Sequence, residues 1–265
     1  LVPRLAETAK ALWYIYLSLT VVCALAYWIV GMNLFDAISH SFTTVAIGGF
    51  STHDQSIGYF DSSAVEVVAV IFMFIAGINF ALHFTAWQKR NVGHYSRDPE
   101  FKFYGFILLS VSLVTVSVLY FSDVYESLFE SVIKGVFQVV SFATTTGFAT
   151  ADFNSWPLFL PYMLLYAAII GACAGSTGGG MKVIRILLIF KQGFREVQRL
   201  IHPKAVIPIK LGKNPVSDRI IESVWGFFAV YVMAYMVMLL ALLATGLDII
   251  TAFSAVGACI NNLGP

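Results

Sequence analysis

Long apolar stretches alternate with short amphipathic ones along this chain of 265 residues. Residues 11–30 form the first apolar stretch, which as a helix is long enough to cross a hydrocarbon core about 30 Å thick. Residues 33–44 follow as an amphipathic segment that is too short to span a bilayer, and a loop containing glycine comes next. Residues 62–87 are again apolar and are predicted to form a second span. The pattern therefore predicts a unit of span, half-helix, glycine-bearing loop and span.

The same unit recurs further along the chain. Residues 103–121 are predicted to span, residues 125–142 to form a short amphipathic helix, and residues 157–171 to begin another span. A third unit starts with the apolar residues 220–245 and the shorter helix 248–259, and we expect it to lack its last span. We predict an all-α integral membrane fold of tandem repeats, each a helix, a pore helix, a filter loop and a helix, arranged pseudo-symmetrically around a pore. The predicted repeats comprise residues 1–95, 96–215 and 216–265.

The composition indicates that the solvent of this protein is a lipid bilayer. The chain is 58% hydrophobic and 12% charged, with a mean hydropathy of +0.81. A soluble domain is about 25% charged. The net charge of +1 gives no reason to expect a nucleic acid as a partner. Cys23, Cys173 and Cys259 show no metal-ligand or disulfide spacing and are expected to be small packing residues.

The placement of charge predicts the orientation in the membrane. Of the 16 Lys and Arg residues, only Lys134 falls on the side of the half-helices. Acidic residues gather on that side instead, namely Asp36, Asp54, Asp61, Asp123, Glu126, Glu130, Asp152 and Asp248. Since basic residues favour the cytoplasmic side, the filters are predicted to open to the outside and the basic loops to face the cytoplasm.

Two of the glycine-bearing loops share a sequence. Residues 41–54 read SFTTVAIGGFSTHD, and residues 141–152 read SFATTTGFATAD. Aligned on Gly49 and Gly147, both continue with phenylalanine and then carry threonine and aspartate at the same spacing. The two glycines are 98 residues apart, so the loops are corresponding parts of an internal repeat.

The composition of these loops suits a cation path. Irregular backbone is tolerated at membrane depth only where it is buried in protein or lines a water-filled cavity. Glycine permits the backbone angles that aim consecutive carbonyl oxygens at one point, while Thr144, Thr145 and Thr146 are expected to turn their side chains into the protein. The C-terminal dipole of the preceding half-helix favours a cation. The alternative is a plain glycine turn between helices, and the recurrence of the loop favours the filter.

The resemblance to a known family rests on these loops. Residues 47–50 and 145–148 are similar to the Thr-Val-Gly-Tyr of potassium-channel filters, whose carbonyls replace the hydration shell of the ion, and residues 262–265 resemble a degenerate copy. With GACAGSTGGGMK at residues 171–182, the chain resembles the Trk/Ktr/HKT superfamily of potassium transporters. The resemblance implies four repeats around a pseudo-fourfold pore and a homodimer. This chain corresponds to the second repeat, the third and the first half of the fourth, so we expect it to be part of a longer protein.

The resemblance assigns the lining of the ion path to three tripeptides. They are Ile47, Gly48 and Gly49; Thr145, Thr146 and Gly147; and Asn262, Leu263 and Gly264. Because the three tripeptides differ, the ring of carbonyls is expected to be less regular than in a symmetric tetramer. Discrimination between potassium and rubidium is therefore expected to be weaker than discrimination between potassium and sodium.

A glycine-rich interruption, residues 171–182, breaks the apolar stretch after the second filter. It superficially resembles a phosphate-binding loop, but the GxxxxGK[ST] pattern is absent and no strand precedes it. A flexible kink is the second interpretation, since each glycine weakens a helix by about 1 kcal/mol. The third, which the resemblance implies, is an intramembrane gate formed by Gly175, Ser176, Thr177, Gly178, Gly179, Gly180 and Lys182. Lys182 either brings positive charge to the ion path or snorkels toward the headgroups.

The helix predicted over residues 183–200 carries basic residues at helical spacing. One interpretation is an anchor for anionic lipid headgroups. The other is a cytoplasmic docking surface, and the resemblance implies a nucleotide-binding RCK-type regulatory subunit of the TrkA type as its partner.

Our sequence-based prediction is potassium transport across the bacterial cytoplasmic (inner) membrane, with potassium as the transported substrate and rubidium as its analogue. No cofactor and no enzymatic activity are expected, because no cluster of His, Asp, Glu or Cys recurs at membrane depth. An ion-coupled secondary transporter is the alternative, and it predicts discontinuous helices in inverted repeats. His40, His53 and His83 show no ligand spacing and are expected to be structural. Glu66, near the outer end of its span, is expected to contact water.

Overall fold

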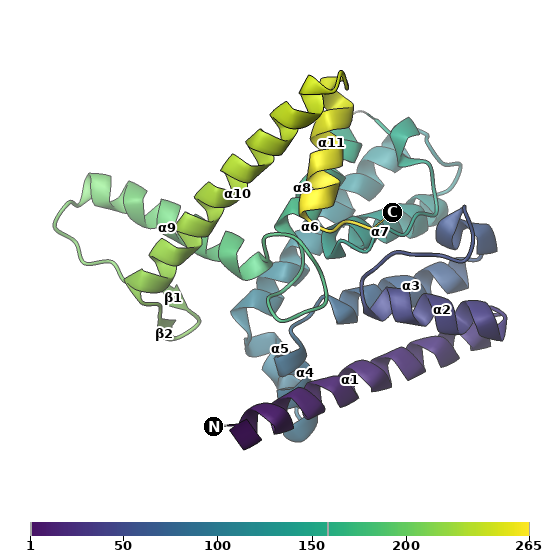
Figure 1. Ribbon diagram of the computed structural model, residues 1–265, viewed down its shortest axis with the longest axis horizontal. Helices are drawn as coiled ribbons and strands as arrows, with labels where there is room; N and C mark the ends of the chain where they lie inside the picture. Colours follow the sequence, from purple (N-terminus) through teal and green to yellow (C-terminus); the bar gives the residue numbers. More distant parts are fainter. Residues whose placement is uncertain (1, 158, 265) are drawn as a thin grey trace.

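The computed structural model describes residues 2–157 and 159–264, and the predicted helical fold is confirmed (Figure 1). In chain order the helices are α1 (Val2–Ile29), α2 (Leu34–Val45), α3 (Ser63–Ala76), α4 (Phe80–Gln88), α5 (Gly93–Arg97), α6 (Pro99–Phe121), α7 (Leu128–Thr144), α8 (Phe159–Ile170), α9 (Val183–Ile201), α10 (Asp218–Ala244) and α11 (Ile249–Ile260). Two short 3-10 helices, η1 (Ser56–Phe60) and η2 (Phe153–Ser155), lie in loops.

Three helices of the described chain are long and apolar enough to cross a membrane by length and composition. They are α1 over Ala9–Ile29, α6 and α10. Their apolar side chains are largely exposed, as at Trp28, Phe106 and Met233, and only 6% of the apolar window of α10 is buried within the chain. Contiguous apolar surface of this extent is suited to contact with lipid or with further protein.

The second apolar stretch was predicted as one span, but α3 and α4 form a pair bent by 89°. Asn79 caps the start of α4, and the backbone groups freed by the break bind the glycine-rich segment after α8. The Cys173 N–H donates to the Gly77 carbonyl at 3.0 Å, and the Phe80 N–H donates to the Gly175 carbonyl at 3.0 Å. The break is therefore stabilised by contacts about 100 residues away in the sequence, which apolar periodicity does not register.

Each of the three half-helices begins at a side-chain cap. The Asn33 side chain accepts from the Asp36 N–H of α2, the Ser127 side chain from the Glu130 N–H of α7, and the Asp248 side chain from N–H groups of α11. Such caps satisfy N–H groups that have no partner within the helix, and each contributes about 1 kcal/mol. We refer to α2, α7 and α11 as the pore helices.

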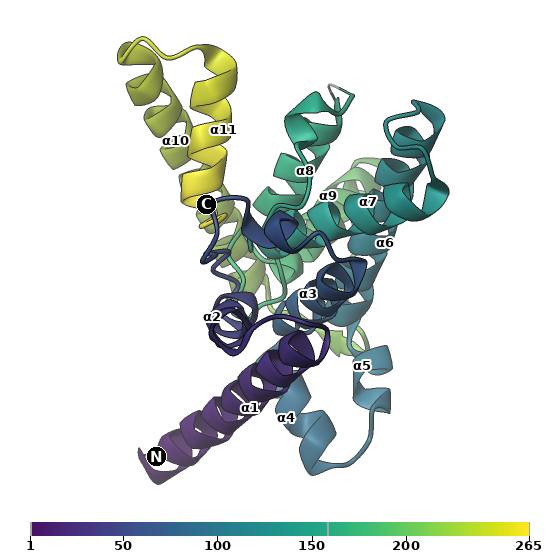
Figure 2. The same ribbon diagram turned by 90° about the vertical axis from the view of Figure 1, so that its right-hand side faces the viewer.

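The pore helix α7 lies at the centre of the buried core. It packs against α3, α6 and α8, and its residues Phe137, Gln138 and Val139 are fully buried. Helix α1 packs across α2, α3 and α4, whereas α10 and α11 run side by side at one edge of the molecule (Figure 2). Helix α11 also contacts α8. The backbones just after the three pore helices come together, Gly49 against Thr146 and Gly147 against Gly264.

A small second core joins α9 to α10. Leu188, Ile209, Ile221 and Val224 form it. The connector also contains a two-stranded antiparallel pair that the sequence did not predict, β1 (Lys210–Leu211) and β2 (Asn214–Pro215). Both strands are only two residues long, so the pair is a local turn that fixes the path between the helices.

Candidate ion-conducting site

The three tripeptides predicted as filter meet directly through their backbones. A Cβ atom added to Gly49 would strike the Thr146 carbonyl, and one added to Gly147 would strike the backbone of Gly264. A Cβ atom at Gly264 would strike the carbonyls of Thr146 and Gly48. The close approach therefore depends on glycine, and it brings together segments separated by up to 216 positions of sequence.

The three tripeptides also share a backbone geometry. The first residue of each is left-handed, with φ of 55° at Ile47, 67° at Thr145 and 52° at Asn262. Gly49 and Gly147, the third residues of the first two, have φ of 71° and 87°. Non-glycine residues rarely adopt this region, and such outliers cluster at functional sites. The match supports the alignment of the three segments, which we call the filter segments (residues 47–49, 145–147 and 262–264).

The threonines of the second filter segment have their side chains bound within the protein. Thr144, Thr145 and Thr146 are fully buried. The Thr144 and Thr146 hydroxyl oxygens are 2.7 Å apart, and the Thr145 hydroxyl oxygen accepts from the Gly179 N–H at 2.6 Å. With the hydroxyls bound in this way, the backbone carbonyls are the groups left to face an ion.

A cluster of polar side chains lies where the chain continues after the first filter segment, around Thr52 and His53. The Asp36 carboxylate accepts from the Thr52 hydroxyl at 2.5 Å and from the Asn33 side-chain amide at 2.7 Å. It also lies 3.1 Å from His53 Nε2. Burial raises the pKa of Asp36, but the hydrogen bonds from Thr52 and His53 outweigh burial and hold this pKa below its ordinary value. His40 is bound at both ring nitrogens. These contacts fit the structural role predicted for the histidines.

The glycine-rich segment reaches the C-terminal end of every pore helix. Helix α8 ends at Ile170 and α9 begins at Val183, so the segment between them, which we call the intramembrane loop, comprises residues 171–182. Its hydrogen bonds run from Thr177 Oγ1 to Val45 O at 2.9 Å, from Gly179 N to Thr145 Oγ1 at 2.6 Å, and from Gly180 N to Asn261 O at 3.1 Å. The loop therefore occupies acceptors at the ends of α2, α7 and α11, where the helix dipoles favour positive charge.

Lys182 ends the intramembrane loop with its charge turned back onto the loop. Its backbone is left-handed, with φ of 78°, and its ammonium donates to the Gly178 carbonyl. The charge is therefore held beside the loop.

A cavity of 570 Å³ separates the loop from the first and third filter segments. Its lining combines residues predicted as filter with residues predicted as gate: Ala46, Ile47, Gly48, Phe50, Thr177, Gly178, Gly179, Asn262, Leu263 and Gly264. Four of the ten lining residues are glycines, which line the cavity only through backbone atoms. Backbone carbonyl oxygens are the groups that replace the hydration shell of a cation in potassium filters.

The comparisons with known proteins agree with this geometry. The family model for TrkH, a cation transport protein, matches residues 1–265. The chain belongs to the TrkH family. This family consists of cation transport proteins and not of enzymes, and the chain is a membrane protein.

Several relatives share the TrkH fold and sequence. The chain is 57% identical over 265 residues to the Trk system potassium uptake protein TrkH of Halomonas elongata, covering 100% of this chain and 55% of the relative. It is 40% identical over 264 residues to the Trk system potassium uptake protein TrkG of Escherichia coli, covering 100% of this chain and 54% of the relative. The crystal structure of the potassium transporter TrkH from Vibrio parahaemolyticus superposes with a TM-score of 0.97 at 54% identity, covering 100% of this chain and 57% of that chain. The chain thus spans about half the length of these TrkH relatives.

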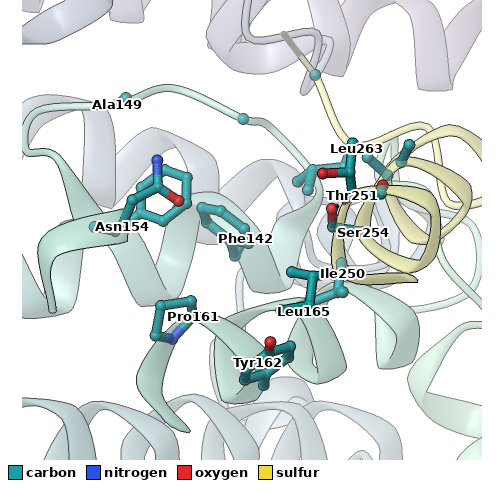
Figure 3. Close-up of a pocket in the computed structure, with 15 residues that line it drawn as sticks. Phe142, Ala149, Asn154, Pro161, Tyr162, Leu165, Ile250, Thr251, Ser254 and Leu263 are labelled. Carbon is teal, nitrogen blue, oxygen red and sulfur yellow. Dashed lines mark hydrogen bonds between the residues drawn. The ribbon is translucent and has the colours of Figure 1, made fainter. Parts of the chain in front are cut away.

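A second cavity, of 560 Å³, opens beside the second and third filter segments (Figure 3). Phe142, Leu165, Tyr162 and Ile250 line it together with Pro161. In Figure 3 these side chains come from the pore helices and from α8. Because these five side chains are mainly apolar, they offer a cation little to replace its hydration shell. The first cavity, with four glycines in its lining, matches an ion path better.

Two residues near this TrkH site were not singled out by the sequence. Asn261, directly before the third filter segment, is fully buried and bonds Tyr231 at 3.0 Å and the Gly257 carbonyl at 2.7 Å. Glu100, in the first turn of α6, is buried against the ends of the intramembrane loop. The only signal available for Glu100 was a carboxylate at the start of an apolar span.

Proposed function

We propose that this chain forms part of the ion path of a potassium uptake protein. Potassium would pass the filter segments, with carbonyl oxygens of residues 47–49, 145–147 and 262–264 replacing its hydration shell. The observation that carries the proposal is the convergence of three segments with one backbone geometry at the dipole ends of three pore helices. The relatives named for potassium uptake support the choice of ion.

The intramembrane loop is proposed as the gate. Gly175, Ser176, Thr177, Gly178, Gly179, Gly180 and Lys182 would obstruct conduction. Support comes from the hydrogen bonds of the loop to all three pore helices and from its place in the wall of the cavity below the filter. Conduction would require the loop to leave these acceptors and to carry the Lys182 charge away from the path.

The remaining assignments follow from the repeats and the charge pattern. The three repeats comprise residues 1–95, 96–215 and 216–265, in a bacterial inner membrane with the filters open to the outside and the basic loops in the cytoplasm. The protein is proposed to form a homodimer and to bind a nucleotide-binding RCK-type (TrkA-type) subunit on the face of α9.

Arg195 is buried and bonds Asp218 at 2.9 Å, so it stabilises the contact of α9 with α10. The exposed Arg199 and Lys204 are the better residues to reverse in a binding test.

Cation competition in proteoliposomes tests the proposal. The full-length protein should take up rubidium, potassium should compete strongly, and sodium should compete weakly. Gly147→Ala should reduce uptake and the preference together, since the added Cβ would strike the Gly264 backbone. Equal competition by sodium and potassium in the unaltered protein would overturn the filter assignment.

A secondary transporter is the second candidate, because the break between α3 and α4 is a discontinuity of the kind found in such proteins. The discriminating measurement is the driving force. Rubidium uptake that requires a proton or sodium gradient favours coupling, and uptake that follows the membrane potential alone favours a channel.

A further inference from the structure

Through one carboxylate oxygen, Glu100 binds the backbone on both sides of the glycines 175–180 of the intramembrane loop. Oε1 of Glu100 accepts from the Ala174 N–H at 2.6 Å and from the Ile184 N–H at 3.2 Å. Ala174 directly precedes Gly175 and the glycines 178–180 of the loop, and Ile184 lies in the first turn of α9. Glu100 itself belongs to α6, so this single oxygen connects α6, the loop and α9.

The environment of Glu100 makes this contact unusual. Glu100 is only 7% exposed, and within the described residues it forms no ion pair with Lys or Arg. Burying a carboxylate is costly unless strong hydrogen bonds replace its hydration. Here backbone N–H groups replace it, and hydrogen bonds from such donors to an ionised acceptor are about twice as strong as neutral ones.

The start of α9 gives the contact a second role. Lys182 stands at the N-cap position of α9, and its side chain makes no capping hydrogen bond. The first N–H groups of a helix need an acceptor, and a negative charge there is stabilised by the helix dipole. Glu100, which belongs to α6, supplies both the acceptor and the negative charge to the start of α9.

We propose that Glu100 is a positioning residue that latches the intramembrane loop in its obstructing position, an inference that rests on the proposed gate. While the Ala174 and Ile184 N–H groups both stay bound to Glu100 Oε1, the loop can leave the pore helices only if its own backbone changes conformation. Movement of α9 would pull on the Ile184 contact and release the Ala174 side of the loop. The latch thereby connects the basic, cytoplasmic helix α9 to the obstruction below the filter.

Rubidium uptake by the full-length protein in proteoliposomes, without any regulatory subunit, tests the latch. Glu100→Gln keeps the shape and removes the charge, and we expect uptake to rise about tenfold, the change that corresponds to losing about 1.4 kcal/mol from the closed state. Glu222→Gln, at an exposed glutamate of α10, is the matched control and should leave uptake unchanged. If Glu100 only stabilised the fold, Glu100→Gln would lower the amount of folded protein without raising the uptake per folded molecule.

The same assay in a loop-deleted background separates the latch from the gate. Deletion of residues 174–180 should itself raise uptake, and Glu100→Gln should add nothing to it. If the deletion raises uptake but Glu100→Gln alone does not, the latch is refuted and the gate stands. If the deletion has no effect, the gate fails. If Glu100→Gln does not fold, Glu100→Asp keeps the charge but shortens its reach, and unchanged uptake in that variant contradicts the latch.

Discussion

The hydroxyl oxygen of Thr145 accepts a hydrogen bond from the backbone N–H of Gly179 at 2.6 Å. One residue belongs to a filter segment and the other to the intramembrane loop, so the elements proposed to select and to obstruct are in direct contact. Both lie in the same repeat, on either side of α8.

Thr145→Val should release this contact. Valine keeps the size and β-branching of threonine, so the backbone strain at φ of 67° is unchanged while the acceptor is lost. The half-buried Gly179 N–H then loses its acceptor, at a cost of about 1–3 kcal/mol to the closed loop, and rubidium uptake should rise at least fivefold. Thr150→Val is the matched control, because the buried Thr150 hydroxyl has no hydrogen-bond partner among the described residues. Equal effects of both variants would contradict a specific role for the contact.

Gly179→Ala should also weaken the closed loop, for steric reasons. The new Cβ would strike the Asn261 carbonyl, which lies at the end of α11. Uptake should therefore rise, whereas Gly193→Ala should not change it. Gly193 lies inside α9 with open space around its Cβ position, so alanine there should raise the free energy of unfolding by about 0.5–1 kcal/mol. Uptake assays and thermal unfolding of the two variants check both expectations.

The ion pair between Lys134 and Glu66 fastens α7 to α3. The two charged groups are 2.7 Å apart, and the Glu66 side chain is only 3% exposed, so the prediction that Glu66 contacts water is wrong. Lys134→Met should lower the free energy of unfolding by about 3–5 kcal/mol, because it leaves a buried carboxylate unpaired. The double variant Glu66→Gln with Lys134→Met should recover most of that loss. Thermal unfolding in detergent checks the pair, and a double variant no more stable than Lys134→Met alone would refute this explanation.

Asp36 should stabilise the chain after the first filter segment, at Thr52 and His53, in a pH-dependent way. Because its folded-state pKa is held below the ordinary value of 3.8, its contribution is present above that value and is lost as the pH falls through the folded-state pKa. Asp36→Asn should therefore lower the unfolding temperature at pH 7 and differ less from the unaltered protein near pH 3. A difference that is constant with pH would show that the charge of Asp36 is not responsible.

The sequence contained local signals for the pore helices and few for the contacts between repeats. The caps Asn33, Ser127 and Asp248 stand directly before amphipathic segments, and those helices were predicted close to their observed bounds. The left-handed residues Ile47, Thr145 and Asn262 give the three segments a shared backbone feature, although their sequences differ. The break at Gly77 and the role of Glu100 depend on bonds to the intramembrane loop, 74 or more positions away, and no periodicity encodes such contacts.

Rubidium uptake by the full-length protein with and without residues 174–180 tests the central claim most directly. We expect the folded deletion variant to take up rubidium at least tenfold faster than the intact protein, with potassium still competing better than sodium. Unchanged uptake in a folded deletion variant would contradict the gate, and faster uptake with no preference for potassium over sodium would contradict the filter.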